Sequence, residues 1–121
     1  MENIQAKPLI LQKKAEVLLN REIYPILKNF PRAEKFALCQ EIKQSCYRVI
    51  RNAIESNCPR KNKLKYYDDI DVELKYLLVL IAVSRDQKYI SKGKALQLQE
   101  MITELGKICG GLIKSDLNKR R

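Results

Sequence analysis

Apolar side chains between residues 39 and 53 recur at intervals of three and four, and this spacing constrains the fold more than any other feature of the sequence. The seam comprises Cys39, Ile42, Cys46, Val49 and Ala53. This 3-4-3-4 pattern is typical of an α-helix that packs at a shallow angle against neighbouring helices. We expect the helix to follow the turn at Phe30–Phe36, where Pro31 ends the preceding helix, and to run to about Ser56.

Three further segments carry apolar stripes at helical spacing. The first extends from about Pro8 to Asn29, and Pro25 should kink this helix or shift its last turn. The other two cover about 66–84 and about 91–117, the latter with Ser91 as its N-cap. The three stripes are Ala15, Leu19, Ile23, Ile26 and Phe30; Ile70, Leu74, Leu77, Ile81 and Ser84; and Ala95, Leu98, Ile102, Leu105, Cys109 and Leu112.

Four amphipathic helices joined by short links predict an all-α protein, an antiparallel up-down-up-down four-helix bundle. No segment shows the alternating pattern of a strand. The length of 121 residues is that of one domain. We therefore expect a single domain over residues 1–121, with an ordered core at about 9–114 and a basic C-terminal tail at 115–121.

Two features suggest contacts beyond one simple bundle. The third helix carries additional apolar residues, Val72, Val79, Leu80 and Val83, so it should be buried on more than one side, either within the bundle or against another subunit. The fourth helix contains Gly106, Gly110 and Gly111, although glycine disfavours a helix by about 1 kcal/mol relative to alanine. This cluster predicts a helix backbone pressed against a neighbouring helix or subunit.

Positive charge is the strongest signal in the composition. The chain has 24 Lys and Arg residues against 14 Asp and Glu residues, a formal net charge of +10. This excess favours a nucleic acid or another polyanion as partner, although a basic, solvated surface would have the same composition. Two rows stand out on the predicted helices: a line of Lys7, Lys14, Arg21 and Lys28 that should point away from the core, and a row of Lys43, Tyr47 and Arg51 beside the seam of the second helix.

The residues that usually carry enzyme or metal chemistry are missing from the sequence or wrongly spaced. There is no histidine, and the four cysteines form no CxxC pair. We interpret Asp68, Asp69 and Asp71 as first-turn residues that complement the dipole of the third helix, rather than as metal ligands. The sequence thus predicts a protein that is not an enzyme, with no cofactor and no metal.

The cysteines and the apolar runs also indicate a cellular location. Cys39 and Cys46 lie on a predicted core seam, where thiols behave as small apolar groups, as is usual in a reducing cytosol. The N-terminus lacks a signal-peptide pattern, and the longest apolar run, Leu77–Val83, is too short to cross a bilayer. We expect a cytoplasmic protein with no membrane partner.

Three strings in the chain, taken together, resemble a known family. They are Tyr24-Pro25-Ile26-Leu27-Lys28-Asn29-Phe30-Pro31-Arg32 with Phe36-Ala37-Leu38 and the helix to Ile54; Leu74-Lys75-Tyr76-Leu77-Leu78-Val79-Leu80 followed by Ile90-Ser91; and Leu105-Gly106-Lys107-Ile108-Cys109-Gly110-Gly111-Leu112-Ile113-Lys114. In order and spacing, over about 9–114, they resemble the four-helix-bundle proteins that include Avd, the accessory variability determinant of diversity-generating retroelements. The same superfamily includes proteins encoded in intervening sequences of ribosomal RNA genes, but the Ser-x-Pro-Ala-Asn-Ile-Ala-Glu-Gly signature of that branch is missing here.

The resemblance implies a function and an assembly. Avd-like proteins form a homopentameric barrel with a basic surface and a central channel, bind the reverse transcriptase and the template RNA of the element, and support mutagenic cDNA synthesis without polymerising. Two positions depart from the pattern of the Avd branch. Leu112 stands where that branch often has Trp, and Val79 stands where it often has Arg. The second departure removes a cation from the third helix, although Lys75 keeps one a turn earlier.

Basic residues at six positions are the candidates for contact with RNA, and with DNA if the cDNA is also bound. They are Arg21, Arg32, Lys35, Lys43, Arg51 and Lys75. The alternative is a stand-alone four-helix-bundle interaction protein of the ribosomal RNA intervening-sequence type, with no retroelement. A third reading, an enzyme, lacks the residues that would carry its chemistry.

Overall fold

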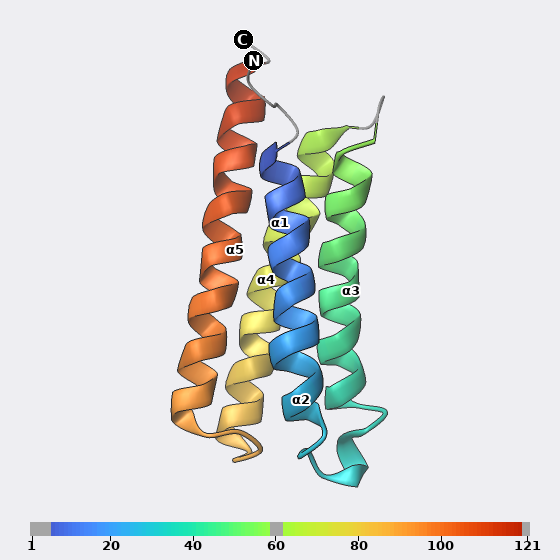
Figure 1. Cartoon of the computed structure of the whole chain (residues 1–121), viewed down its shortest axis with the longest axis vertical. Helices are drawn as coiled ribbons and strands as arrows, with labels where there is room; N and C mark the ends of the chain where they lie inside the picture. The colour runs from blue at the N-terminus through green and yellow to red at the C-terminus, as the bar shows by residue number, and fades with distance from the viewer. Residues whose placement is uncertain (1–5, 59–61, 120–121) are drawn as a thin grey trace.

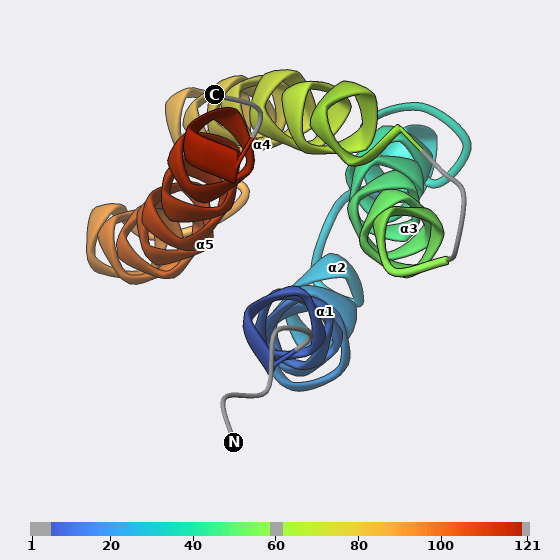
Figure 2. The same cartoon turned by 90° about the horizontal axis from the view of Figure 1, so that it is seen from above.

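A computed structural model describes residues 6–58 and 62–119 and confirms the all-α, antiparallel up-down-up-down four-helix bundle (Figure 1). Its elements are, in chain order, α1 (Ala6–Val17), the π-helical turn η1 (Leu18–Ile23), α2 (Tyr24–Leu27), the 3₁₀ turn η2 (Arg32–Glu34), α3 (Leu38–Ser56), α4 (Lys63–Asp86) and α5 (Lys92–Lys119). Because α1, η1 and α2 follow one another directly, they form the first long helix of the bundle. Seen end-on, this helix contacts α3 and α5 and lies across the bundle from α4 (Figure 2).

The predicted seams form the core of the bundle. Every seam residue of α3, α4 and α5 is buried. So are Ala15, Leu19 and Ile23 of the first helix and Phe30, which lies in the turn after it, with Ile26 partly buried beside them. Two residues of the first helix that the stripe did not include, Leu11 and Leu18, are also buried. The 3-4 spacing therefore predicted the packing correctly, with one deviation near Pro25.

That deviation is a wide turn rather than a sharp kink. Through η1 the helix loosens, and the backbone N–H of Tyr24 donates to the carbonyl of Leu19, five residues back. Pro25 has no N–H to donate, and its ring crowds the carbonyl four residues before it. A π-turn directly upstream is a usual way for a helix to absorb this conflict. The buried residues Ala15, Leu19 and Ile23 keep intervals of four through this turn, so the widening does not take the apolar face out of the core.

The turn after Pro31 is longer than the sequence suggested. Pro31 adopts an extended backbone (φ −57°, ψ 146°), η2 follows, and Ala37 interrupts the helical path (φ −120°, ψ −101°) before α3 begins at Leu38. The carboxylate of Glu34 accepts a hydrogen bond from the Leu38 amide at 3.3 Å, so it satisfies one of the free N–H groups of the first turn of α3.

The interpretation of the three aspartates as first-turn residues is wrong. Helix α4 begins at Lys63, and its cap is Asn62, whose side-chain oxygen accepts from the Lys65 amide at 3.4 Å. The aspartates lie one turn or more further on, where Asp69 pairs with Lys65 at 3.1 Å and Asp71 with Lys75 at 3.0 Å. The residues 63–65, which the sequence placed in a connection, are helical because the Asn62 cap starts the helix earlier. Within the described ranges, no group of three or more possible metal-ligating side chains occurs.

Helix α5 begins and ends close to its predicted limits. The Ser91 hydroxyl accepts from the Lys94 amide at 3.0 Å, which confirms Ser91 as the N-cap. The helix continues to Lys119, so residues 115–119 of the predicted tail are helical. A Cβ added at Gly106, Gly110 or Gly111 would meet nothing within 4 Å. The expected close approach of another helix of the same bundle is therefore wrong, because these glycines face open space.

An outer stripe of α4 is exposed in the described bundle, although the Tyr76 hydroxyl donates to the Glu41 carboxylate of α3 at 2.7 Å. Val72, Tyr76, Val79 and Val83 recur at intervals of four, three and four, and all four are exposed, Val72 by 66% and Val79 by 57%. Of the residues that widen the α4 seam, only Leu80 is buried. We call Val72, Tyr76, Val79 and Val83 the outer α4 stripe.

None of the helices in the described ranges combines the length and the apolarity needed to cross a membrane.

Candidate nucleic-acid interface

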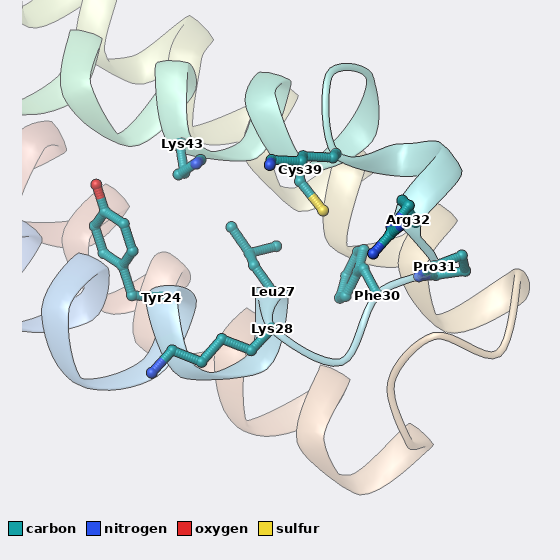
Figure 3. A pocket seen from close by; sticks show the side chains of 9 residues that line it. Tyr24, Leu27, Lys28, Phe30, Pro31, Arg32, Cys39 and Lys43 are labelled. Carbon is teal, nitrogen blue, oxygen red and sulfur yellow. The ribbon is translucent and has the colours of Figure 1, made fainter.

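A pocket of about 470 Å³ lies at the end of the bundle where the first helix turns into α3. Its walls come from α2, from the turn that follows and from the first turns of α3. In Figure 3, Tyr24, Lys28 and Lys43 stand on one side of this space and Phe30, Pro31 and Arg32 on the other, with Leu27 and Cys39 between them. The lining residues are Tyr24, Leu27, Lys28, Phe30, Pro31, Arg32, Lys35, Cys39 and Lys43, and we call this site the turn pocket.

Two prolines position the walls of the turn pocket. The π-turn upstream of Pro25 rotates α2 relative to an unbroken α-helix, and this rotation sets the direction of Tyr24 and Lys28. Pro31 then holds the chain extended, and Arg32, the first residue of η2, lines one side of the pocket (Figure 3). The pocket thus depends on the two places where the sequence departs from regular helix.

Four cations line the turn pocket: Lys28, Arg32, Lys35 and Lys43. None of the nine lining residues is acidic, and within the described part of the chain none of the four cations makes an ion pair. A neighbouring acid, Glu34, accepts a hydrogen bond from the Tyr89 hydroxyl at 2.9 Å in addition to the one from Leu38. Four uncompensated positive charges around one hollow favour a bound anion, and phosphate in particular, because both Arg and Lys bind it well.

The floor of the turn pocket is apolar. We use the word floor for the apolar part of the lining, which comprises Leu27, Phe30, Pro31 and Cys39. The Phe30 ring packs against Tyr89 with centroids 5.2 Å apart. Burial raises the pKa of the Cys39 thiol, and the charge of Glu34 raises it further, while that of Lys43 acts in the opposite direction. Cys39 therefore remains a neutral thiol at neutral pH and adds to the apolar surface.

An aromatic pair closes one side of the site. The hydroxyls of Tyr24 and Tyr47 share a hydrogen bond, which raises the pKa of Tyr47. The Lys43 ammonium lies 5.8 Å from the centre of the Tyr24 ring, within the range of a cation–π contact. These contacts tie α2 to α3 and hold Lys43 beside the opening of the pocket.

The structure brings together three of the six candidate residues. Arg32, Lys35 and Lys43 line the turn pocket, whereas Arg21 on η1, Arg51 on α3 and Lys75 on α4 are exposed elsewhere. Lys75 is also partly neutralised by Asp71. Of the six predicted nucleic-acid-binding residues, three therefore form one cluster and the other three lie at separate places on the surface.

The predicted line of basic residues does not form one face, although Lys14, Arg21 and Lys28 are all exposed, as predicted. Lys14 reaches α5, where its ammonium lies 3.5 Å from the Glu104 carboxylate, and Lys28 lines the turn pocket. Lys7, the first member of the line, lies outside the described side chains. The seven-residue spacing predicts a single line only for an uninterrupted α-helix, and the π-turn at η1 shifts everything that follows by one residue.

Sequence reasoning missed Lys28 and Tyr24 as members of the site. The available signal was local, since Tyr24-Pro25 and Phe30-Pro31-Arg32 place aromatic and basic residues on both sides of Lys28 within one turn region. Aromatic side chains interleaved with cations are typical of nucleic-acid contacts.

Comparison with known proteins identifies a family. A family model described as bAvd-like matches residues 9–116, which is nearly the whole chain. No curated protein and no solved structure matches the chain significantly.

Proposed function

The chain belongs to the bAvd-like family, and on this premise we propose that it is the non-catalytic accessory protein of a diversity-generating retroelement. In this role it binds the element's reverse transcriptase and its template RNA or cDNA, and supports mutagenic retrohoming. The observation that carries the proposal is the clustering of Lys28, Arg32, Lys35 and Lys43 around a pocket with no acidic residue in its lining. The formal net charge of +10 supports it, because cations that neutralise phosphates release counterions and so provide affinity independent of sequence.

The proposed form of the protein is a homopentamer. The outer α4 stripe supports self-association, since three valines and Tyr76 lie exposed at seam spacing on one helix. The open space beside the three glycines of α5 is also compatible with a subunit contact at that helix.

The RNA-binding part of the proposal is tested with charge variants. In the triple variant Arg32→Glu, Lys35→Glu and Lys43→Glu, we expect the affinity for template RNA to fall by at least about tenfold, because three phosphate contacts become repulsive. The dependence of affinity on salt should become shallower, since fewer counterions are released. Fluorescence anisotropy at several salt concentrations measures both effects.

The matched control changes charge equally at exposed lysines of α5, with Lys92→Glu, Lys107→Glu and Lys114→Glu. If both triple variants lose the same affinity, the interaction is a general effect of net charge and the turn pocket has no special part in it. If the wild-type protein binds no RNA, the basic-surface mechanism is wrong.

The partner is tested by genomic context and by co-purification. A reverse-transcriptase gene with a template–variable repeat pair beside this gene would support the retroelement role, and the encoded enzyme should co-purify with this chain. If no such gene is found, the stand-alone interaction protein of the ribosomal RNA intervening-sequence type becomes the better reading.

A further inference from the structure

We infer that the turn pocket takes up one unpaired nucleotide of a single-stranded RNA, with its base on the apolar floor and the flanking phosphates on the surrounding cations. This inference rests on the proposed function and specifies which part of an RNA the site recognises. It assigns a discrete binding site, with Arg32 and Lys43 as phosphate ligands and Leu27 and Phe30 as base contacts.

The size of the turn pocket suits a single nucleotide. Its volume of about 470 Å³ lies in the range of pockets that hold small ligands. A double helix keeps its bases stacked inside and presents only its backbone to such a hollow, so it cannot reach the floor. Bases of single-stranded RNA are free to turn outward and contact apolar and aromatic side chains.

The arrangement of charge fits a strand that passes across the pocket. Lys43 and Lys28 stand on the side of Tyr24, and Arg32 stands opposite, beside Phe30 (Figure 3). A strand with one base inserted places a phosphate on each side of that base, so each phosphate meets a cation. The planar guanidinium of Arg32 can donate two parallel hydrogen bonds to one phosphate.

The apolar and aromatic part of its lining distinguishes the turn pocket from a simple surface patch of lysines. Leu27, Phe30, Pro31 and Cys39 form a floor that offers nothing to a hydrated inorganic anion. A base has two apolar faces and gains free energy from such a surface whatever its identity. The combination of cationic rim and apolar floor therefore favours a nucleotide over phosphate alone. An acidic peptide with an aromatic side chain is the competing occupant, and the test below separates the two.

The test changes the shape of the pocket without changing its charge. Leu27 lines the pocket and is only partly buried, so Leu27→Trp fills the hollow. We expect the dissociation constant for a short single-stranded RNA to rise at least about fivefold, because the base contact is lost. The affinity for a duplex RNA of the same length should be unchanged. The control Leu96→Trp, at an exposed position of α5, should alter neither affinity.

A fluorescent base provides a direct readout. A short single-stranded RNA carrying one 2-aminopurine should change its emission on binding to the wild-type protein and to Leu96→Trp, but not to Leu27→Trp. Circular dichroism of the Leu27→Trp protein confirms that the bundle is intact. A second variant, Arg32→Gln with Lys43→Gln, keeps the floor and should weaken single-strand binding more than Lys107→Gln with Lys114→Gln does.

Each outcome decides between defined alternatives. If the wild-type protein binds both RNAs and Leu27→Trp changes neither affinity, the nucleotide pocket is wrong while the proposed RNA role stands. If the wild-type protein binds no RNA, both fail. Displacement of the single strand by free AMP at equal affinity would overturn the assignment to a strand. Tighter binding of a peptide of Glu and Phe, lost in Leu27→Trp, would assign the pocket to a protein partner instead.

Discussion

Cys46 and Cys109 are the residues whose acid–base chemistry the fold changes most. Burial raises the pKa of each thiol from an ordinary value of 9.0 to about 12, with smaller contributions from Glu73 at Cys46 and from Asp71 and Asp68 at Cys109. The thiol of Cys109 donates to the Tyr67 carbonyl at 3.2 Å. Both cysteines therefore stay protonated inside the bundle at a pH where an unfolded chain has lost the protons.

The two thiols should make the fold sensitive to alkaline pH. Between about pH 9 and 12 the folded state binds more protons than the unfolded state, so the free energy of unfolding falls as the pH rises through this range. Urea denaturation at a series of pH values measures the slope. The double variant Cys46→Ala and Cys109→Ala should have a smaller slope than the wild type, whatever its absolute stability. An equal slope in both proteins would show that these thiols do not control the effect.

Glu73 links α4 to α3 through three side-chain hydrogen bonds. Its carboxylate accepts a hydrogen bond from Ser45 at 2.8 Å and two from Arg48, at 2.8 and 3.1 Å. Ser45 is fully buried and Glu73 is mostly buried, whereas the Arg48 side chain is 43% exposed. Arg48 therefore stabilises the bundle and is already engaged, which separates it from the cations of the turn pocket.

Removing the charge of Glu73 should weaken the bundle measurably. We expect Glu73→Gln to lower the free energy of unfolding by about 1 kcal/mol, a value reduced for the exposure of Arg48. The control Asp69→Asn breaks an exposed pair with Lys65 and should have no measurable effect. Chemical denaturation of the two variants provides the comparison, and equal stabilities would argue against a special role for Glu73.

At the scale of helices, the sequence predicted the packing faces well and the local irregularities poorly. The buried face follows from apolar spacing, which is why the seams of α3, α4 and α5 were predicted residue by residue. The π-turn at η1 was not predicted, because Pro25 indicates that the helix is disrupted but not whether it bends or widens. The start of α4 was misplaced for a similar reason, since the Asn62 cap outweighs the basic residues around it.

The glycines of α5 provide a test at the same scale. Because a Cβ at Gly110 meets nothing within 4 Å, Gly110→Ala should stabilise an isolated subunit by about 1 kcal/mol. If another subunit covers this surface, the same change should also weaken self-association. Gly93→Ala, in the first turn of the helix and equally open, is the control. Thermal denaturation at low concentration and sedimentation at high concentration measure the two effects, and unchanged association would place Gly110 outside any interface.

For the whole molecule, the candidate site was predictable only in part. Arg32, Lys35 and Lys43 were identified from the turn motif and from their place beside the α3 seam. Their meeting with Lys28 depends on how α2 packs against α3, which helical spacing does not specify. Arg21, Arg51 and Lys75 were predicted for the same site because they carry the same charge, but they do not line the pocket. Charge alone does not indicate which part of the surface forms a pocket.

The outer α4 stripe leads to a prediction about assembly. Size-exclusion chromatography with light scattering should give the mass of a pentamer, and Val79→Asp should reduce that mass, because a carboxylate would be buried at an apolar contact. The control Leu117→Asp changes an exposed apolar residue near the end of α5 and should leave the mass unchanged. A wild-type protein that elutes as a clean monomer would contradict the pentamer.

The number of residues in the wide turn at Leu18–Ile23 determines the direction in which the side chains of α2 point. Each residue of an α-helix turns the next by about 100°, so one surplus residue in this turn rotates the whole segment from Tyr24 to Phe30 about the helix axis. Removing a single residue here, such as the exposed Asn20, would shorten the helix by only a small rise yet point Lys28 and Tyr24 in another direction. In this protein a deletion upstream can therefore abolish the turn pocket while every residue that lines it is retained.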